Sequence, residues 1–329
     1  MANKFYQWQK FRSRFGLWKR IFFRSKKEKI NKLIENQGER RVQFSEESLQ
    51  LLETLGQENL RVKEFIINNY KGLPVSPEME EETYNYCVTH SAIFAVTTSN
   101  PGTSTLTEFL YEGIPFPSPI DNYFLQSKGG KAVKARLIAI EKELPKIIEE
   151  YRSKGNVLIG NLGSGPGRDV IDTLSNYYRN ISDVRAIHID RDKKALERGK
   201  RMAEIKGVNH LIEFVQENFL RYTPPQKFDI LLLIGVLCPL EIETCIEYLK
   251  TTKRLLKEGG CIVASNVSKK MLREDPFTYY LMKWGANWEL VYKNEEELKQ
   301  IYEKSGYRWE RCFSDSYGFH IMGIGRPYF

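Results

Sequence analysis

Short runs of almost uninterrupted apolar residues alternate with longer amphipathic segments in the second half of the chain. The runs occupy residues 157–159, 184–189, 211–215, 228–235 and 261–265. Strands of a parallel sheet that is covered by helices on both faces have this continuous apolar character. The alternation therefore predicts an α/β domain in which five buried strands are connected by helices.

The end of the chain has a different pattern. Residues 295–304 have helical periodicity, a turn follows at Gly306, and residues 308–327 predict a hairpin around 314–318. We expect this hairpin to add an antiparallel pair of strands to the sheet. Just before the fifth strand, we expect residues 255–260 to end a helix, because two glycines close that segment.

The first half of the chain predicts helices. Ser45 can cap a helix that carries spaced leucines and stops at Gly72. A second helical segment begins at Pro77 and ends near residue 100, and the proline-rich segment 115–119 predicts a loop. A further helix is expected to run from Gly130.

The positive charge of the chain is concentrated at its start. Residues 1–41 contain thirteen Lys or Arg and three Glu, a balance of +10, so the formal net charge of +8 leaves −2 for the rest. Aromatic residues recur in this segment at three- or four-residue steps, on one face of a predicted helix: Phe5, Trp8, Phe11, Phe15, Trp18 and Phe22. Such a basic helix can pack on the rest of the protein, lie on an anionic membrane surface, or stack on nucleic acid, which the acidic remainder of the chain makes the less favoured partner.

Composition indicates a globular protein. Hydrophobic residues make up 41% of 329 positions, and neither a signal peptide nor an apolar stretch of about 20 residues is present. We therefore expect a cytoplasmic protein, with membrane-surface contact through residues 1–41. The four histidines and five cysteines are not spaced as metal ligands, so no metal site is expected.

The segment after the first strand, Asn-Leu-Gly-Ser-Gly-Pro-Gly, is a glycine-rich loop that opens a helix. Gly163, Gly165 and Gly167 allow a ligand to approach the backbone closely, and the N–H groups at the start of the helix can bind it. A dinucleotide fingerprint would place its third glycine at position 168, where the chain has Arg168. The loop alone can also be an ordinary turn.

The next two strands end in residues that suit a nucleoside. Asp190 follows the second strand, where a carboxylate can accept hydrogen bonds from ribose hydroxyls. Asn218 and Phe219 follow the third strand and could bind an adenine amino group and ring.

With these motifs in this order, residues 130–329 resemble the class I S-adenosylmethionine-dependent methyltransferases. The resemblance implies an α/β, Rossmann-like sheet of seven strands with an antiparallel last strand, methyl transfer as the activity, and S-adenosyl-L-methionine as the cofactor. Two residues depart from the family pattern: Asn161 and Asn218 stand where acids are usual, so charged acceptors are replaced by amides that can still accept hydrogen bonds. The cofactor-binding residues that the resemblance implies are Asn161, Gly163, Ser164, Gly165, Gly167, Asp190, Arg191, Asn218, Phe219, Ile234 and Gly235.

The resemblance also predicts a division into three parts. Residues 1–41 would form a basic amphipathic arm, 42–125 a helical cap over the pocket, and 126–329 the methyltransferase domain. Aromatic residues are expected to bind the acceptor, although core packing explains them nearly as well: Tyr123, Tyr279, Trp284 and Trp288. The charges of Lys131 and Arg136, on the helix after residue 130, are expected to be solvated.

A weaker similarity connects the chain to bacterial methyltransferases that esterify fatty-acid-derived signals. It favours transfer to oxygen of a small, apolar or lipid-like acceptor. No residue can be assigned as the catalytic base from the sequence, because Glu241 and His320 are more easily explained as structural residues. The alternatives are an RNA methyltransferase that uses the basic arm, and a non-catalytic cofactor-binding scaffold.

Overall fold

The computed structural model describes residues 44–286 and 288–328. The basic aromatic segment 1–41, with its predicted membrane contact, lies outside the described residues. The chain divides into the units Met1–Phe44 and Ser45–Phe329, and the second is described below. Within the described ranges, no helix is both long enough and apolar enough to span a bilayer.

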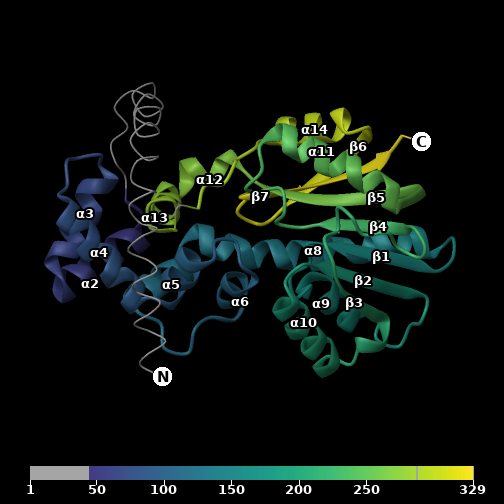
Figure 1. The fold of residues 1–329 in the computed structure, drawn as a ribbon, viewed down its shortest axis with the longest axis horizontal. Coiled ribbons are helices and arrows are strands. Elements are labelled where there is room, and N and C mark those ends of the chain that lie inside the picture. The colour runs from purple at the N-terminus through teal and green to yellow at the C-terminus, as the bar shows by residue number, and fades with distance from the viewer. Residues whose placement is uncertain (1–43, 287, 329) are drawn as a thin grey trace. The chain divides into compact units, whose positions relative to one another are not determined.

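Helices form most of the first part of the second unit and connect the strands of the rest (Figure 1). They are α2 (Glu46–Glu58), α3 (Leu60–Tyr70), α4 (Pro77–His90), α5 (Ala92–Ser99), α6 (Ser104–Glu112), α7 (Pro119–Gln126), α8 (Lys128–Arg152), α9 (Arg168–Tyr177), α10 (Lys193–Ile205), α11 (Ile242–Thr252), α12 (Lys269–Glu274), α13 (Pro276–Ala286) and α14 (Glu295–Lys304), with short 3-10 helices η1 (Asn209–Leu211) and η2 (Lys253–Leu255).

Seven strands form one sheet in the order β3-β2-β1-β4-β5-β7-β6. Five of them run parallel to their neighbours, and β7 runs antiparallel to β5 and β6. Their bounds are β1 (Val157–Leu162), β2 (Val184–Asp190), β3 (Ile212–Gln216), β4 (Phe228–Leu233), β5 (Leu256–Val267), β6 (Tyr307–Ser314) and β7 (His320–Pro327). The prediction of a Rossmann-like, seven-stranded sheet with an antiparallel last strand is confirmed.

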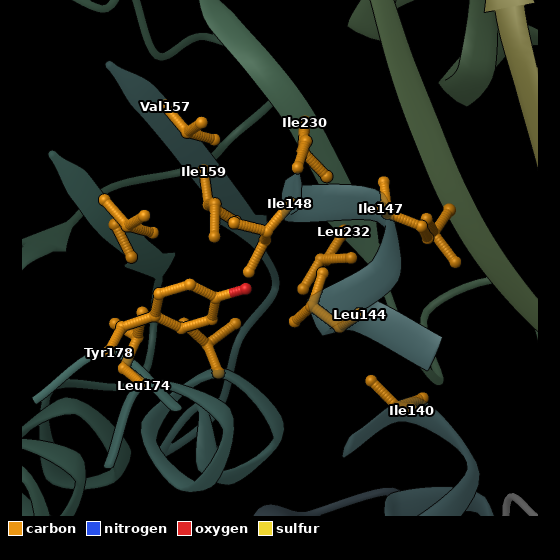
Figure 2. Packing of buried hydrophobic residues seen from close by; sticks show 14 of the residues in the cluster. Ile140, Leu144, Ile147, Ile148, Val157, Ile159, Leu174, Tyr178, Ile230 and Leu232 are labelled. Atoms are coloured by element: carbon orange, nitrogen blue, oxygen red, sulfur yellow. The ribbon is translucent and has the colours of Figure 1, made fainter. Parts of the chain in front are cut away.

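Helices α8 and α9 cover one face of this sheet. Isoleucine and leucine side chains of α8 meet those of β1 and β4, and Leu174 and Tyr178 close the layer (Figure 2). Each such side chain stabilises the fold by roughly 1.5–3 kcal/mol when it is fully buried. The labelled members of this core are Ile140, Leu144, Ile147, Ile148, Val157, Ile159, Leu174, Tyr178, Ile230 and Leu232.

The opposite face is covered by α11 and α14. Tyr302 of α14 is fully buried there, and its hydroxyl donates to the carbonyl oxygen of Gly323 at 2.6 Å and accepts from the backbone N–H of Ala264 at 2.9 Å. A single side chain thus connects the antiparallel strand β7 with the parallel strand β5. Because both faces are covered, the central strands β1 and β4 are buried along almost their whole length, as the sequence predicts, whereas the edge strands β3 and β6 carry polar residues.

The helical segments in the first half are shorter than predicted. Ser45 caps α2, as expected, but the predicted helix up to Gly72 breaks at Asn59, whose side chain accepts from the Val62 N–H and starts α3. Ser91 similarly separates α4 from α5 by capping the second of them. In both places a residue with a good capping side chain competes with helix continuation.

Two further predictions about the elements are incomplete or wrong. The helical segment does not extend to the glycines: α11 ends at Thr252, the 3-10 helix η2 ends at Leu255, and β5 begins at Leu256. The glycines lie within the first half of that long strand. Helices α6 and α7, on either side of the proline-rich loop, are not predicted at all because each spans only eight or nine residues.

Aromatic side chains connect the N-terminal helices to α13. Trp284 of α13 packs against Phe65 of α3 and Phe94 of α5, with ring centroids 5.2 and 5.8 Å apart. Tyr123 of α7 contacts Phe277 at 5.4 Å. The helices before the sheet and the insertion after β5 therefore share one aromatic cluster, and both belong to the unit Ser45–Phe329.

Candidate active site

The glycine-rich loop begins where β1 ends and crosses the end of β2. The backbone N–H of Gly163 donates to the carbonyl oxygen of Ile189 at 2.8 Å. Gly163, Gly165 and Gly167 have φ values of 62, 56 and 75°, the left-handed region that favours glycine. The loop then opens α9, whose N-cap Gly167 has no side chain to cap it; the Val170 N–H is bonded to the Asp169 side chain, which leaves the N–H groups of Arg168 and Asp169 for a ligand.

A buried histidine lies directly beneath this loop. His188 of β2 is fully buried, and a methyl group at Gly167 would collide with its ring. Burial lowers the pKa of His188 to about 3, so the imidazole is neutral at physiological pH. Its ring also packs edge to face with Phe214 at 5.1 Å. The histidine ring therefore determines, by packing, how closely the loop approaches β2.

Asp190, the predicted ribose acid, is at the end of β2 and contacts the loop. Its Oδ2 accepts from the Gly165 N–H at 2.7 Å, and its Oδ1 accepts from the Asp192 N–H at 2.8 Å. Each carboxylate oxygen keeps a second lone pair, so the half-buried group can still accept from hydroxyls. Ser164 lies in the loop with its hydroxyl on the Gly165 carbonyl at 3.1 Å, whereas the side chain of Arg191 is exposed.

Asn161 is accompanied by a carboxylate that the sequence analysis did not identify. Its Nδ2 donates to Oδ1 of Asp169, in the first turn of α9, at 3.0 Å. The same Oδ1 accepts from the Val170 N–H at 2.9 Å. Burial raises the pKa of Asp169, and the hydrogen bonds from Val170 and Asn161 and the charge of Arg136 act in the opposite direction. An acid is therefore present beside position 161, supplied by the following helix.

Arg136 is not solvated, contrary to the prediction. It is only 8% exposed, and its Nε has no hydrogen-bond partner among the described residues. Its Nη2 donates to the Tyr111 hydroxyl at 3.4 Å, and its Nη1 lies 3.5 Å from where a β-carbon of Gly235 would be. A buried guanidinium close to Asp169 and to the end of β4 can bind an anionic group.

The predicted residues after β3 and β4 border the same loop. Phe219 lies 3.8 Å from the position of a β-carbon at Gly163 and packs against Tyr248 at 5.9 Å. Asn218 is half-buried, and its Oδ1 accepts from the Leu220 N–H at 3.1 Å. Ile234 packs on the core cluster that includes α8, and the Gly235 N–H donates to Ser265 Oγ at 2.7 Å.

Helix α6 covers the glycine loop. Its first residue, Ser104, places its β-carbon 3.3 Å from the β-carbon position of Gly165. Arg198 of α10 holds this helix from the other side: its Nη2 donates to Ser104 Oγ at 2.6 Å and its Nε to Glu108 Oε1 at 3.0 Å.

The far end of α6 contacts α8 and α9. Glu112 Oε1 accepts from Nη1 of Arg168, the first residue of α9, at 2.7 Å. Tyr111, one residue earlier, accepts from Arg136. The helix thus bridges the loop, the start of α9 and the buried arginine, and it supplies contacts that the sequence analysis missed.

A cavity of about 430 Å³ lies beside α6 and α8. The lining residue Tyr111 accepts a hydrogen bond from Arg136, which lies beside the end of β4. Its lining combines residues of α6, the end of α7, one face of α8 and the turn between β6 and β7: Leu110, Tyr111, Glu112, Gly113, Leu125, Gln126, Lys131, Lys134, Ala135, Ile138, Ser316 and Tyr317.

The four aromatic residues predicted to bind the acceptor are not among those that line this cavity. Tyr123 is 3% exposed, and its hydroxyl is hydrogen-bonded to Thr278 Oγ1 at 2.7 Å. Trp284 belongs to the aromatic cluster and donates from Nε1 to Glu80 at 3.3 Å. Tyr279 packs on a neighbouring tyrosine ring at 5.5 Å, and Trp288 lies next to Gly102, at 3.9 Å from its β-carbon position.

His320 forms a buried pair with an acid. Its Nδ1 lies 3.2 Å from Oδ2 of Asp315, across the turn between β6 and β7. Burial lowers the pKa of His320, while Asp315 opposes that shift. Among the residues that the structure describes, no cluster of His, Cys, Asp or Glu could hold a metal ion.

Comparison with known proteins decides what this site belongs to. Residues 153–308 match the family model described as a methyltransferase domain. Residues 153–308 therefore form a methyltransferase domain, and the sheet has the class I fold. Curated proteins give no sequence match. The cofactor of this family is S-adenosylmethionine, and the protein is an S-adenosylmethionine-dependent methyltransferase.

Solved structures share the fold at low sequence identity. A Bordetella parapertussis protein described as a possible exported protein superposes with a TM-score of 0.63, at 15% identity over 86% of this chain and 98% of that chain. Magnesium protoporphyrin IX methyltransferase of Synechocystis PCC 6803 with bound S-adenosylhomocysteine gives 0.52, at 12% identity over 72% and 100%. The pyocyanin biosynthetic protein PhzM gives 0.51, at 14% identity over 86% and 74%. At these identities the likeness concerns the fold.

The residues present fit the cofactor. Three left-handed glycines leave the loop backbone open to a ligand, Asp190 offers free lone pairs, and the buried Arg136 and Asp169 provide one charge of each sign. The methionine end of S-adenosylmethionine carries an ammonium and a carboxylate, which these two charges complement.

Proposed function

We propose that the protein transfers a methyl group from S-adenosylmethionine to an oxygen atom of a small, apolar or lipid-like molecule. The observation that carries this proposal is the position of α6, which lies over the glycine loop and is held there by Arg198 and Arg168. The cavity of about 430 Å³ beside this helix has the size of a small acceptor.

The charges around the loop favour a small molecule over RNA. Arg198 and Arg168 flank the loop and would be available to phosphates in a nucleic-acid-binding enzyme. Instead, Arg198 pairs with Glu108 at 3.0 Å and Arg168 with Glu112 and Asp172 at 2.7 and 3.1 Å. The acids on α6 therefore neutralise this basic surface and close it.

Each part of the cofactor has a chemical complement in the proposed site. Asp190 would bind the ribose hydroxyls, and Asn218 and Phe219 the adenine. Asp169, in place of an acid at position 161, would bind the ammonium, and Arg136 would bind the carboxylate. Oδ2 of Asp169 makes no hydrogen bond within the described ranges, whereas Oδ1 makes two, which leaves Oδ2 for the ligand.

S-adenosylmethionine, when bound, supplies an electrophilic methyl group on a sulfonium. The protein then has to align the acceptor oxygen with that methyl and exclude water. Helix α6 and the apolar segment from Ile234 to Cys238 provide the exclusion, since Leu237 and Cys238 are buried. A carboxyl oxygen needs no base to react, which fits a site to which we assign none.

The proposal can be tested by following the methyl group. Purified protein is first titrated calorimetrically with S-adenosylmethionine and is then incubated with methyl-labelled cofactor and a cell extract. We expect the label in the fraction soluble in organic solvent, resistant to ribonuclease. Release of volatile label by mild alkali would identify a methyl ester, and alkali-stable label an ether.

The matched control is Asp190→Ala, which removes the proposed ribose acid and should abolish both heat of binding and labelling. Label that enters RNA and disappears after ribonuclease would refute the small-molecule proposal. Label in a base-stable N-methyl product would refute transfer to oxygen.

A further inference from the structure

The cavity beside α6 and α8 combines an apolar wall with two lysines. Leu110, Leu125 and Ile138 contribute apolar side chains, and Lys131 and Lys134 contribute the charges. Positions 131, 134 and 138 follow each other at three- and four-residue steps and so lie on one face of α8. Charge and apolar surface are therefore presented to the same space.

The cavity's own acid does not neutralise these lysines. Glu112 is the one acidic residue of the lining, and it is bound to Arg168 at 2.7 Å. No ion pair of Lys131 or Lys134 occurs within the described parts of the chain. Lys131 helps to lower the pKa of Glu47 of α2, although a backbone hydrogen bond of that glutamate contributes more. The lining thus carries a net positive charge.

One residue of the cavity lining contacts the predicted site. Tyr111 is part of its lining, and the hydroxyl of that residue accepts from the buried Arg136. Arg136 in turn lies 3.5 Å from the β-carbon position of Gly235, at the end of β4. Tyr111 and Arg136 therefore lie between the cavity and the end of β4, and an acceptor in the cavity would contact the first of them.

We propose that the acceptor is an amphipathic anion that binds in this cavity. Its apolar body packs against Leu110, Leu125 and Ile138, and its carboxylate or phosphate group is bound by Lys131 and Lys134. This inference rests on the proposed function, because it names the acceptor class of the same site. A neutral apolar acceptor would leave both ammonium groups without a role in recognition.

The test compares probes that have the same ten-carbon chain and different head groups. Binding of decanoate, decyl phosphate, decanol and decylamine is measured calorimetrically with the full chain saturated with S-adenosylhomocysteine. We expect one of the two anions to bind best, which separates a carboxylate from a phosphate acceptor, and decylamine to bind worst. The variant K131M/K134M should bind that anion about tenfold more weakly and decanol unchanged.

The control variant K142M/K146M removes two charges from the same helix outside the cavity lining and should bind all four probes like the wild type. Equal binding of decanol and decanoate to the wild type, or equal losses in the two double variants, would overturn the inference. Failure of the protein to bind S-adenosylhomocysteine would instead refute the proposed function. Each outcome therefore identifies which of the two ideas is wrong.

Discussion

The carboxylate of Asp169 gives the sharpest test of the proposed cofactor site. Asp169→Asn keeps the shape of the side chain and an oxygen for the Asn161 and Val170 donors, and removes only the negative charge. A hydrogen bond to a charged partner contributes about 1.5–3 kcal/mol. We therefore expect affinity for S-adenosylhomocysteine to fall by roughly 10- to 150-fold, since each 1.4 kcal/mol is a factor of ten.

The assay uses a second ligand to show which part of the cofactor accounts for the loss of affinity. Titration calorimetry with S-adenosylhomocysteine is repeated with 5′-methylthioadenosine, which has the same nucleoside and sulfur but neither ammonium nor carboxylate. Asp169→Asn should leave the second affinity unchanged. Asp190→Asn, at the proposed ribose position, should weaken both ligands and serves as the matched control.

A charge swap completes the test. The variant N161D/D169N moves the carboxylate back across the 3.0 Å hydrogen bond to position 161, and should regain most of the lost affinity for S-adenosylhomocysteine. The single variant Asn161→Asp puts two carboxylates in contact, so we expect the pKa of the pair to rise and binding to become pH-dependent. Equal losses for both ligands in Asp169→Asn, or no loss for either, would refute the assignment.

Three further predictions concern stability. Gly167→Ala should destabilise the domain by at least about 2 kcal/mol in urea unfolding, because the added methyl group collides with His188 and residue 167 has a φ of 75°. The double variant G167A/H188A should recover part of this stability, and fully additive losses in the two single variants would contradict the packing account. The lowered pKa of His188, about 3 against 6.5 when unfolded, means that the unfolded chain gains a proton first as pH falls, so stability should drop by about 2 kcal/mol between pH 7 and 5, and His188→Met should remove this acid-dependent part. Lys293→Met should lower the free energy of unfolding by about 3 kcal/mol, because the buried ammonium donates to Leu240 O at 2.7 Å and to Asn266 Oδ1 at 3.1 Å. An unchanged midpoint of urea unfolding would show that these acceptors find other donors.

The sequence predicts the sheet well because its signals are local and strong. The parallel strands contain short apolar runs, nearly continuous in β4, and the three glycines fall where β1 turns into α9. The breaks at Asn59 and Ser91 are missed because the apolar pattern continues through both residues, and only the local competition for capping decides there.

The residues added to the candidate site depend on tertiary contacts. Asp169 lies eight positions after Asn161 and reaches it only because the loop reverses the chain. Arg136 looks like one more surface charge of an amphipathic helix, and its burial depends on tertiary contacts that include Tyr111 of α6, a nine-residue helix without a strong pattern. A signal was available in the Thr103 cap and the spacing of Leu106 and Leu110, but short helices of this kind are rarely decided by periodicity.

Helix α6 contacts both the cofactor loop and the cavity proposed for the acceptor. Its N-terminal end contacts Gly165 and Arg198 beside the cofactor loop, and its C-terminal end, from Leu110 to Gly113, lines the cavity. If a ligand at one end shifts the helix as a unit, the other end moves with it, and the two occupants should then alter each other's affinity by the same factor. The order in which cofactor and acceptor bind, and the rate at which S-adenosylhomocysteine leaves, would then depend on the position of this nine-residue helix as well as on each pocket.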